Sequence, residues 1–149
     1  MSMELDTNNA ETSRAQDAAR IALGLMLVTA GVSHLTFARE PFKAQVPDWV
    51  PLDPDTVVLQ SGVVEIALGS ALVFLPQHKT LVGRIAGAFF TCVFPGNISQ
   101  YTHHRSAFGL DTDAKRLTRL FFQPALVAWA LWSTRSKPVC PPRAGSFPK

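Results

Sequence analysis

The stretch "IALGLMLVTAGVSHLTFA", residues 21–38, holds 18 uncharged residues between Arg20 and Arg39. A helix needs about 20 mostly apolar residues to cross the roughly 30 Å of hydrocarbon in a bilayer. The alternative is a helix of a water-soluble protein, which would carry an apolar stripe on one face and charges on the other. This stretch is uncharged on every face, so we predict that it spans a membrane.

The rest of the chain repeats this pattern three times. Residues 56–78 contain Glu65 as their one charged residue, residues 85–104 are 20 uncharged residues, and residues 120–134 are 15. The last stretch is long enough if its flanking basic side chains reach the lipid headgroups. We therefore predict an all-α membrane protein, a four-transmembrane-helix bundle, with spans at about 18–38, 56–76, 80–100 and 117–135.

The 149 residues are enough for one domain, here residues 18–135. We expect a disordered polar tail at residues 1–17 and a flexible, proline-rich tail at residues 136–149. No cleavable signal peptide is evident. Four spans place both termini on one side, and that side would hold eight of the 14 Lys and Arg residues. The positive-inside rule then predicts that both termini are cytoplasmic.

Several kinds of site are not expected. Cys92 and Cys140 are far apart and neither belongs to a CxxC pair, which argues against a disulfide framework, a zinc site and dithiol chemistry. His103 and His104 lack a third ligand at metal spacing. The net charge of +3 is ordinary for basic residues beside membrane spans, so we expect no nucleic-acid partner. No haem, flavin, iron–sulfur or nucleotide motif is present, so we expect no covalently bound cofactor and no catalytic residues.

Polar residues gather at one depth of the predicted spans. In the cytoplasmic-termini orientation, each span brings its strongest hydrogen-bonding groups to its outer half. An ionised Glu65 facing lipid would cost several kcal/mol, so it must be neutral, paired or beside a wet cavity. His34 and Arg119 are the candidates to share a network with it. We predict a ligand-binding pocket formed by five residues: His34, Glu65, Asn97, Arg119 and Gln123. The alternative is that these groups only hold the helices together by hydrogen bonds.

Glycines lie on the same helix faces as these polar groups. Gly31 shares a face with His34, and Gly62 shares one with Glu65, which predicts close helix packing with the polar side chains turned inward. The GxxxG pair at residues 83 and 87 predicts helix packing as well. "FPGN", residues 94–97, places a proline inside the third span. We expect Pro95 to remove a backbone hydrogen bond, kink the helix and line the mouth of the pocket.

The chain resembles the DoxX family of small bacterial four-helix membrane proteins over roughly residues 18–134. The resemblance is carried by four stretches in order: "AGVSHLTFAREPFKAQVPDWVP", "SGVVEIALGSALVFLP", "FPGNISQY" and "RLFFQPALVAWALW". It implies a multi-pass protein of the bacterial inner (plasma) membrane, and some members are membrane subunits of oxidoreductases that pass electrons to quinone. The positions that match the family pattern are the five pocket residues. Paired cysteines found in some redox relatives are missing from this chain.

Two hypotheses about function follow. The first is an accessory subunit, not an enzyme on its own, that binds a quinone or another small lipophile and serves a membrane-associated redox enzyme. In it, Glu65 and His34 would bond or exchange protons with the ligand's polar head, while Arg119, Asn97 and Gln123 orient the ligand. The second is a non-enzymatic interaction or assembly factor whose polar cluster only fixes helix packing. The sequence predicts neither the partner's identity nor the oligomeric state.

Overall fold

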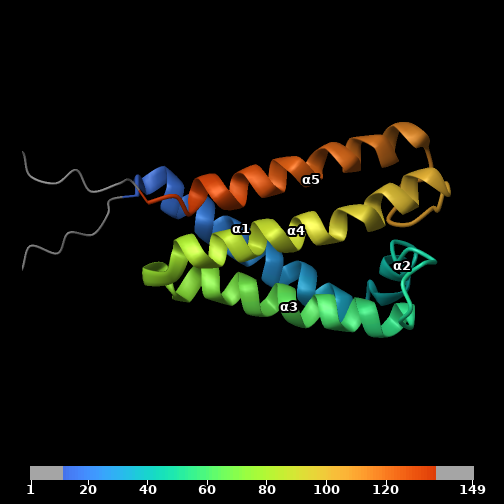
Figure 1. The fold of residues 1–149 in the computed structure, drawn as a ribbon, viewed down its shortest axis with the longest axis horizontal. Helices are drawn as coiled ribbons and strands as arrows, with labels where there is room; N and C mark the ends of the chain where they lie inside the picture. Colours follow the sequence, from blue (N-terminus) through green and yellow to red (C-terminus); the bar gives the residue numbers. More distant parts are fainter. Residues whose placement is uncertain (1–11, 137–149) are drawn as a thin grey trace, which may run out of the picture.

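The computed structural model describes residues 12–136, and all regular structure in this range is helical. Four long helices lie alongside one another: α1 (Arg14–Leu35), α3 (Pro54–Phe74), α4 (Lys79–Thr102) and α5 (Asp113–Ser133). Two short elements connect them, the helix α2 (Arg39–Lys43) and the 3-10 helix η1 (Pro76–His78). Figure 1 shows α2 and the α4–α5 connection at one end of the long helices, called here the α2 end. The described chain ends lie at the other, the terminal end.

Helices α1 and α5 begin earlier than the uncharged stretches suggest because polar side chains cap them. Ser13 accepts a hydrogen bond from the Gln16 backbone and Gln16 reciprocates, a capping box that starts α1 at Arg14. Residues 12–17 therefore form a helix start, which corrects the prediction of disorder for that part of the N-terminal tail. Residues 1–11 and 137–149 of the predicted tails lie outside the described range. Thr112 starts α5 in a similar way, by accepting a hydrogen bond from the Lys115 backbone.

Three helical segments are long and apolar enough to cross a membrane: Arg14–Leu35, Pro54–Phe74 and Pro76–Thr102. They match the first three predicted spans to within a few residues. Helix α5 is not among them. Its first two turns carry Lys115, Arg116 and Arg119, which lower its mean hydropathy although its remainder is apolar.

Helices α1 and α3 pack with their backbones in close approach, as the glycine pattern predicts. A Cβ added to Gly31 would lie 2.5 Å from the carbonyl oxygen of Gly62, and one added to Gly69 would lie 2.5 Å from that of Gly24. No L-residue with a side chain fits at such distances. The pair α4–α5 is closed in part by Gly83, whose missing Cβ leaves room for Thr134. The predicted packing role of glycine is confirmed at these positions.

The main apolar core lies toward the terminal end. Its buried members come from all four long helices: Leu23, Leu27, Leu68, Leu72, Val82, Ala86, Phe90 and Ala130. Beside the buried Val46 and Val58, the α2 end also buries a group of polar side chains from four helices: His34, Glu65, Asn97 and Gln123. A polar group loses free energy on burial unless it finds a partner. We therefore expect the functional site at the α2 end.

Helix α4 continues through Pro95 for seven residues, to Thr102. The proline therefore does not end the helix. It has no N–H to donate to the carbonyl four residues earlier, so this turn of α4 lacks one backbone hydrogen bond. Pro95, Gly96 and Asn97 all line the cavity described next.

Candidate functional site

A cavity of about 370 Å³ lies between the long helices at the α2 end. This volume is in the range of small-molecule sites, which are typically a few hundred Å³. The five predicted site residues all line it: His34 from α1, Glu65 from α3, Asn97 from α4, and Arg119 and Gln123 from α5. The structure thus brings the whole predicted set together, while a ligand-binding role for it stays a prediction.

The α1–α3 wall carries a buried histidine–carboxylate pair. Nδ1 of His34 lies 2.9 Å from Oε2 of Glu65, with side chains only 6% and 11% exposed. The contact lacks hydrogen-bond geometry, so Glu65 Oε2 forms no hydrogen bond within residues 12–136. His34 Nε2, the other ring nitrogen, has no hydrogen-bond partner in this range either. Ser61 Oγ lies 3.4 Å from the same Nδ1. Unpartnered polar atoms at these depths are costly, which makes them candidates to bind a ligand.

Local packing fixes the position of His34. A Cβ on Gly62 would lie 2.8 Å from the His34 Cβ, so only glycine at this position of α3 lets the histidine approach the helix. On its other side the imidazole meets Phe42 edge to face, with ring centroids 3.5 Å apart. The ring is thereby held between α3 and the segment that follows α1.

The α4–α5 wall is a chain of three hydrogen bonds. Arg119 Nε donates to Asn97 Oδ1 at 3.3 Å, and Asn97 Nδ2 donates to Gln123 Oε1 at 2.8 Å. Gln123 Nε2 in turn donates to the carbonyl oxygen of Phe90 at 2.6 Å. The polar groups that line the cavity therefore form two separate sets of contacts, one on each wall. His34 reaches Glu65, whereas no carboxylate in the described part of the chain lies within ion-pair distance of Arg119.

Residues 42–50, called here the cover segment, close the cavity at the α2 end. Six of them line it: Phe42, Gln45, Val46, Pro47, Trp49 and Val50. Arg105, from the α4–α5 connection, holds this segment in place. Its guanidinium donates to the Val46 carbonyl at 3.0 Å and to both carboxylate oxygens of Asp48 at 2.6 Å.

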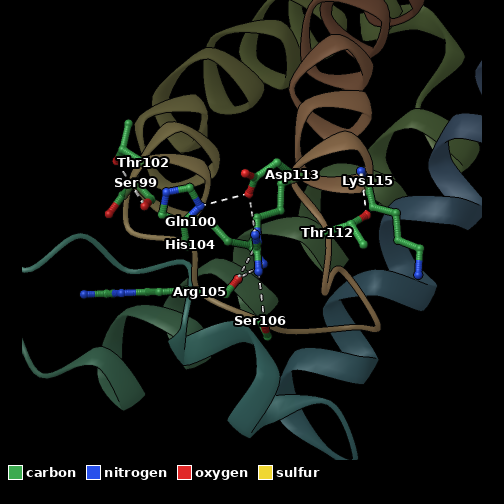
Figure 2. Close-up of polar contacts among 10 residues, drawn as sticks. Ser99, Gln100, Thr102, His104, Arg105, Ser106, Thr112, Asp113 and Lys115 are labelled. Carbon is green, nitrogen blue, oxygen red and sulfur yellow. Dashed lines mark hydrogen bonds and ion pairs between the residues drawn. The ribbon is translucent and has the colours of Figure 1, made fainter.

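A second arginine orders the α4–α5 connection. Arg116 is buried, and it donates to Asp113 at 2.7 Å, to Ser106 at 3.0 Å and to the Arg105 carbonyl at 3.4 Å. Figure 2 shows these partners together with His104, whose Nδ1 lies 2.9 Å from the Asp113 carboxylate. The same connection presents a phenylalanine to the cavity side. Phe108 packs on Phe42 at 4.5 Å, and the Arg119 guanidinium lies 5.5 Å from its ring centre.

Gly96 tests the role of the cover segment. A Cβ at this position would lie 2.6 Å from the carbonyl oxygen of Gln45, so Gly96→Ala should push the cover segment away from α4. We expect a loss of about 1–3 kcal/mol of stability and lower hydrogen-exchange protection of residues 44–50. Gly87→Ala is the matched control, because its Cβ would meet only side-chain atoms at 3.4 Å or more. Equal protection of residues 44–50 in the two variants would contradict a covering role.

The contact between Asp48 and Arg105 predicts a pH dependence of the cover segment. The hydrogen bond from Arg105, and then its charge, hold the pKa of the Asp48 carboxyl below its ordinary value of 3.8. A lowered folded-state pKa adds stability at neutral pH that is lost as the pH falls through that pKa. We expect hydrogen-exchange protection of residues 44–50 to be constant near neutrality and to fall below about pH 4.

Asp48→Asn should give the low-protection state already at pH 7. The control is Asp111→Asn, which removes a carboxylate that pairs with Lys115 and does not touch the cover segment. If protection of residues 44–50 is the same in all three proteins at pH 7, the contact does not hold the cover segment.

Some residues that shape the site carry no signal in the sequence. Phe108 has a left-handed backbone (φ 56°) and is followed by Gly109 (φ 71°). No sequence motif predicts this turn. Arg105 and Arg116 read as ordinary juxtamembrane charges, although each bonds to several groups in the loops. No three His, Cys, Asp or Glu side chains between residues 12 and 136 lie close enough together to hold a metal ion.

Comparison with known proteins identifies the family of this chain but no activity. No curated protein and no solved structure has significant similarity to the chain. A family model described as a domain of unknown function (DUF8561) matches residues 23–134, about three quarters of the chain and a range that includes all five predicted site residues. The chain belongs to the DUF8561 family.

Proposed function

We propose that this protein is a multi-pass membrane protein that holds a small lipophilic molecule with a polar head, such as a quinone, in the cavity at the α2 end. In this proposal it is an accessory subunit that serves a membrane oxidoreductase rather than an enzyme by itself. The observation that carries the proposal is the buried, unpartnered Nε2 of His34 in a cavity of about 370 Å³. A ligand oxygen there would give this nitrogen the partner that the described residues do not provide.

A fourth span formed by α5 belongs to the same proposal. Beyond Arg119 this helix exposes large apolar side chains that water would not favour: Phe121, Phe122, Leu131 and Trp132. The basic residues of its first turns would then lie at the headgroup level. With four spans, the charge count of the sequence favours cytoplasmic termini and places the cavity in the outer half of the bilayer.

The redox partner and the bacterial inner membrane rest on the resemblance to the DoxX family. That resemblance is independent of the cavity, and each part is tested separately. A quinone is one lipophile that fits this description, because Asn97 and Arg119 on one wall carry N–H groups able to donate to a carbonyl oxygen and His34 lies on the other wall.

The test is extraction of the protein from its native membrane into lipid nanodiscs, followed by mass spectrometry of everything that co-purifies. We expect a stoichiometric lipophile in the wild type and its loss in Glu65→Gln and His34→Ala. Glu40→Gln and His78→Ala are matched controls, since both residues are exposed and neither lines the cavity. Retention of the lipophile in all four variants would remove these residues from the binding site. Bulk lipid alone in every sample would end the proposal.

The alternative is an interaction or assembly factor without a ligand. The bonds from Asn97 to Gln123 and from Gln123 to the Phe90 carbonyl favour it, because they join α4 to α5 with no ligand required. This alternative predicts that Glu65→Gln lowers the unfolding temperature in detergent while every sample stays free of a specific ligand.

A further inference from the structure

A second cavity, of about 480 Å³, lies beside the first, between α1 and α5. Four lining residues are common to both: Met26, Arg119, Gln123 and Leu126. Helices α1 and α5 contact each other much less than α1 contacts α3. Met26 and Phe122, which line the second cavity, are 38% and 61% exposed. This side cavity therefore opens laterally, where lipid chains would surround a spanning helix.

Arg119 lines both cavities, and no carboxylate among residues 12–136 pairs with it. A guanidinium stays protonated in proteins, and charges at membrane depth normally pair with one another. Glu65 is the one carboxylate lining the first cavity, and it lies beside His34; no carboxylate lines the side cavity. Lys115, the other cation of the side cavity, already pairs with Asp111 at 2.7 Å. Arg119 is thus an unmatched positive charge facing both spaces.

The hydrogen bonds that connect Arg119, Asn97 and Gln123 leave N–H donors, rather than acceptors, free at this site. The amide oxygens of Asn97 and Gln123 each accept a bond from within this series, which ends on the Phe90 carbonyl. Among the Arg119 nitrogens, only Nε takes part in this series of hydrogen bonds. The two Nη groups form no hydrogen bond to any other described residue. Such a fork matches the two oxygens of a carboxylate.

We propose that the ligand is a single-chain amphiphile with a carboxylate head, bound with its head on Arg119 and its chain in the side cavity against Met26 and Phe122. One unmatched guanidinium balances one negative charge. Cavities of a few hundred Å³ suit one chain rather than a two-chain phospholipid. This inference rests on the proposed function, since it keeps a lipophile with a polar head at this site and names its chemical class, a carboxylate in place of a quinone.

The experiment compares matched probes on the full chain in phosphatidylcholine nanodiscs. The probes are isotope-labelled hexadecanoate, its neutral methyl ester and a neutral alkyl benzoquinone, with retained ligand counted per protein. We expect saturable binding of hexadecanoate near one per chain, and roughly tenfold to hundredfold weaker binding of the ester. Arg119→Gln should abolish the preference for the acid, and Arg119→Lys should retain part of it. Arg84→Gln, the same change at an exposed site outside both cavities, should leave it intact.

The outcomes separate this inference from the proposed function. Binding of the benzoquinone without preference for the acid over the ester would overturn the inference and keep the cavity as a lipophile site. Binding of none of the three probes would remove both. If Arg84→Gln and Arg119→Gln lose the preference for the acid equally, the preference comes from the net charge of the protein and not from Arg119. If an anionic phospholipid displaces hexadecanoate, the site binds a phospholipid headgroup instead of a single-chain carboxylate. The comparison of acid with ester needs no variant, so misfolding of Arg119→Gln would not remove the test.

Discussion

Gly69→Ala should separate α1 from α3 and lower the free energy of unfolding by about 1–2 kcal/mol. The added Cβ would lie 2.5 Å from the Gly24 carbonyl oxygen and 2.8 Å from the Val28 amide nitrogen. Both are backbone atoms, so no side chain can rotate away and the two helices must move apart. Overpacking of this kind costs about 1–3 kcal/mol, against which alanine regains about 0.5–1 kcal/mol of helix propensity. The measurement is thermal or chemical unfolding in detergent.

Gly87→Ala supplies the control on the other helix pair. Its Cβ would meet Leu131 side-chain atoms at 3.4 Å and beyond, an ordinary contact distance. We expect this variant to be as stable as the wild type or slightly more stable, because only the propensity gain remains. If Gly69→Ala and Gly87→Ala unfold at the same temperature, the close approach of α1 and α3 is not a requirement of the fold.

His34→Ala should destabilise the protein by about 3 kcal/mol, because it leaves the Glu65 carboxylate buried without its partner. Breaking a buried charge pair by removing one member typically costs about 3–5 kcal/mol. The lower end is expected here, since the cavity beside Glu65 leaves the carboxylate room to relax. The measurement is again unfolding in detergent, with the exposed His78→Ala as the control for loss of an imidazole.

The double variant His34→Ala/Glu65→Gln tests whether the unpaired Glu65 carboxylate causes the loss of stability. Glutamine keeps the shape of the side chain and removes the charge, so most of the lost stability should return. A double variant as unstable as the single one would mean that lost packing of the imidazole, for example against Phe42, is the cause. A stable double variant that carries no ligand would separate the binding role of the pair from its structural role.

The sequence by itself predicted three helices of membrane-spanning length and five polar residues that come to line one cavity. Uncharged stretches report the solvent around a helix directly, which is why the first three spans fall close to α1, α3 and α4. The site could be predicted for a related reason. A membrane span has few uses for Glu65 or Asn97, so polar residues at one depth stand out, and all five line one cavity.

The tertiary structure alone decided how these residues pair and what covers them. Arg119 and His34 were equal candidates to meet Glu65, because helix periodicity gives the face of a residue and not its neighbour across a gap. The close approach of α1 to α3 at Gly62 brings His34 to the carboxylate, while Arg119 turns to Asn97. The cover segment depends on Arg105 contacts between loops far apart in the chain, and such long-range contacts leave no periodic signal in either loop.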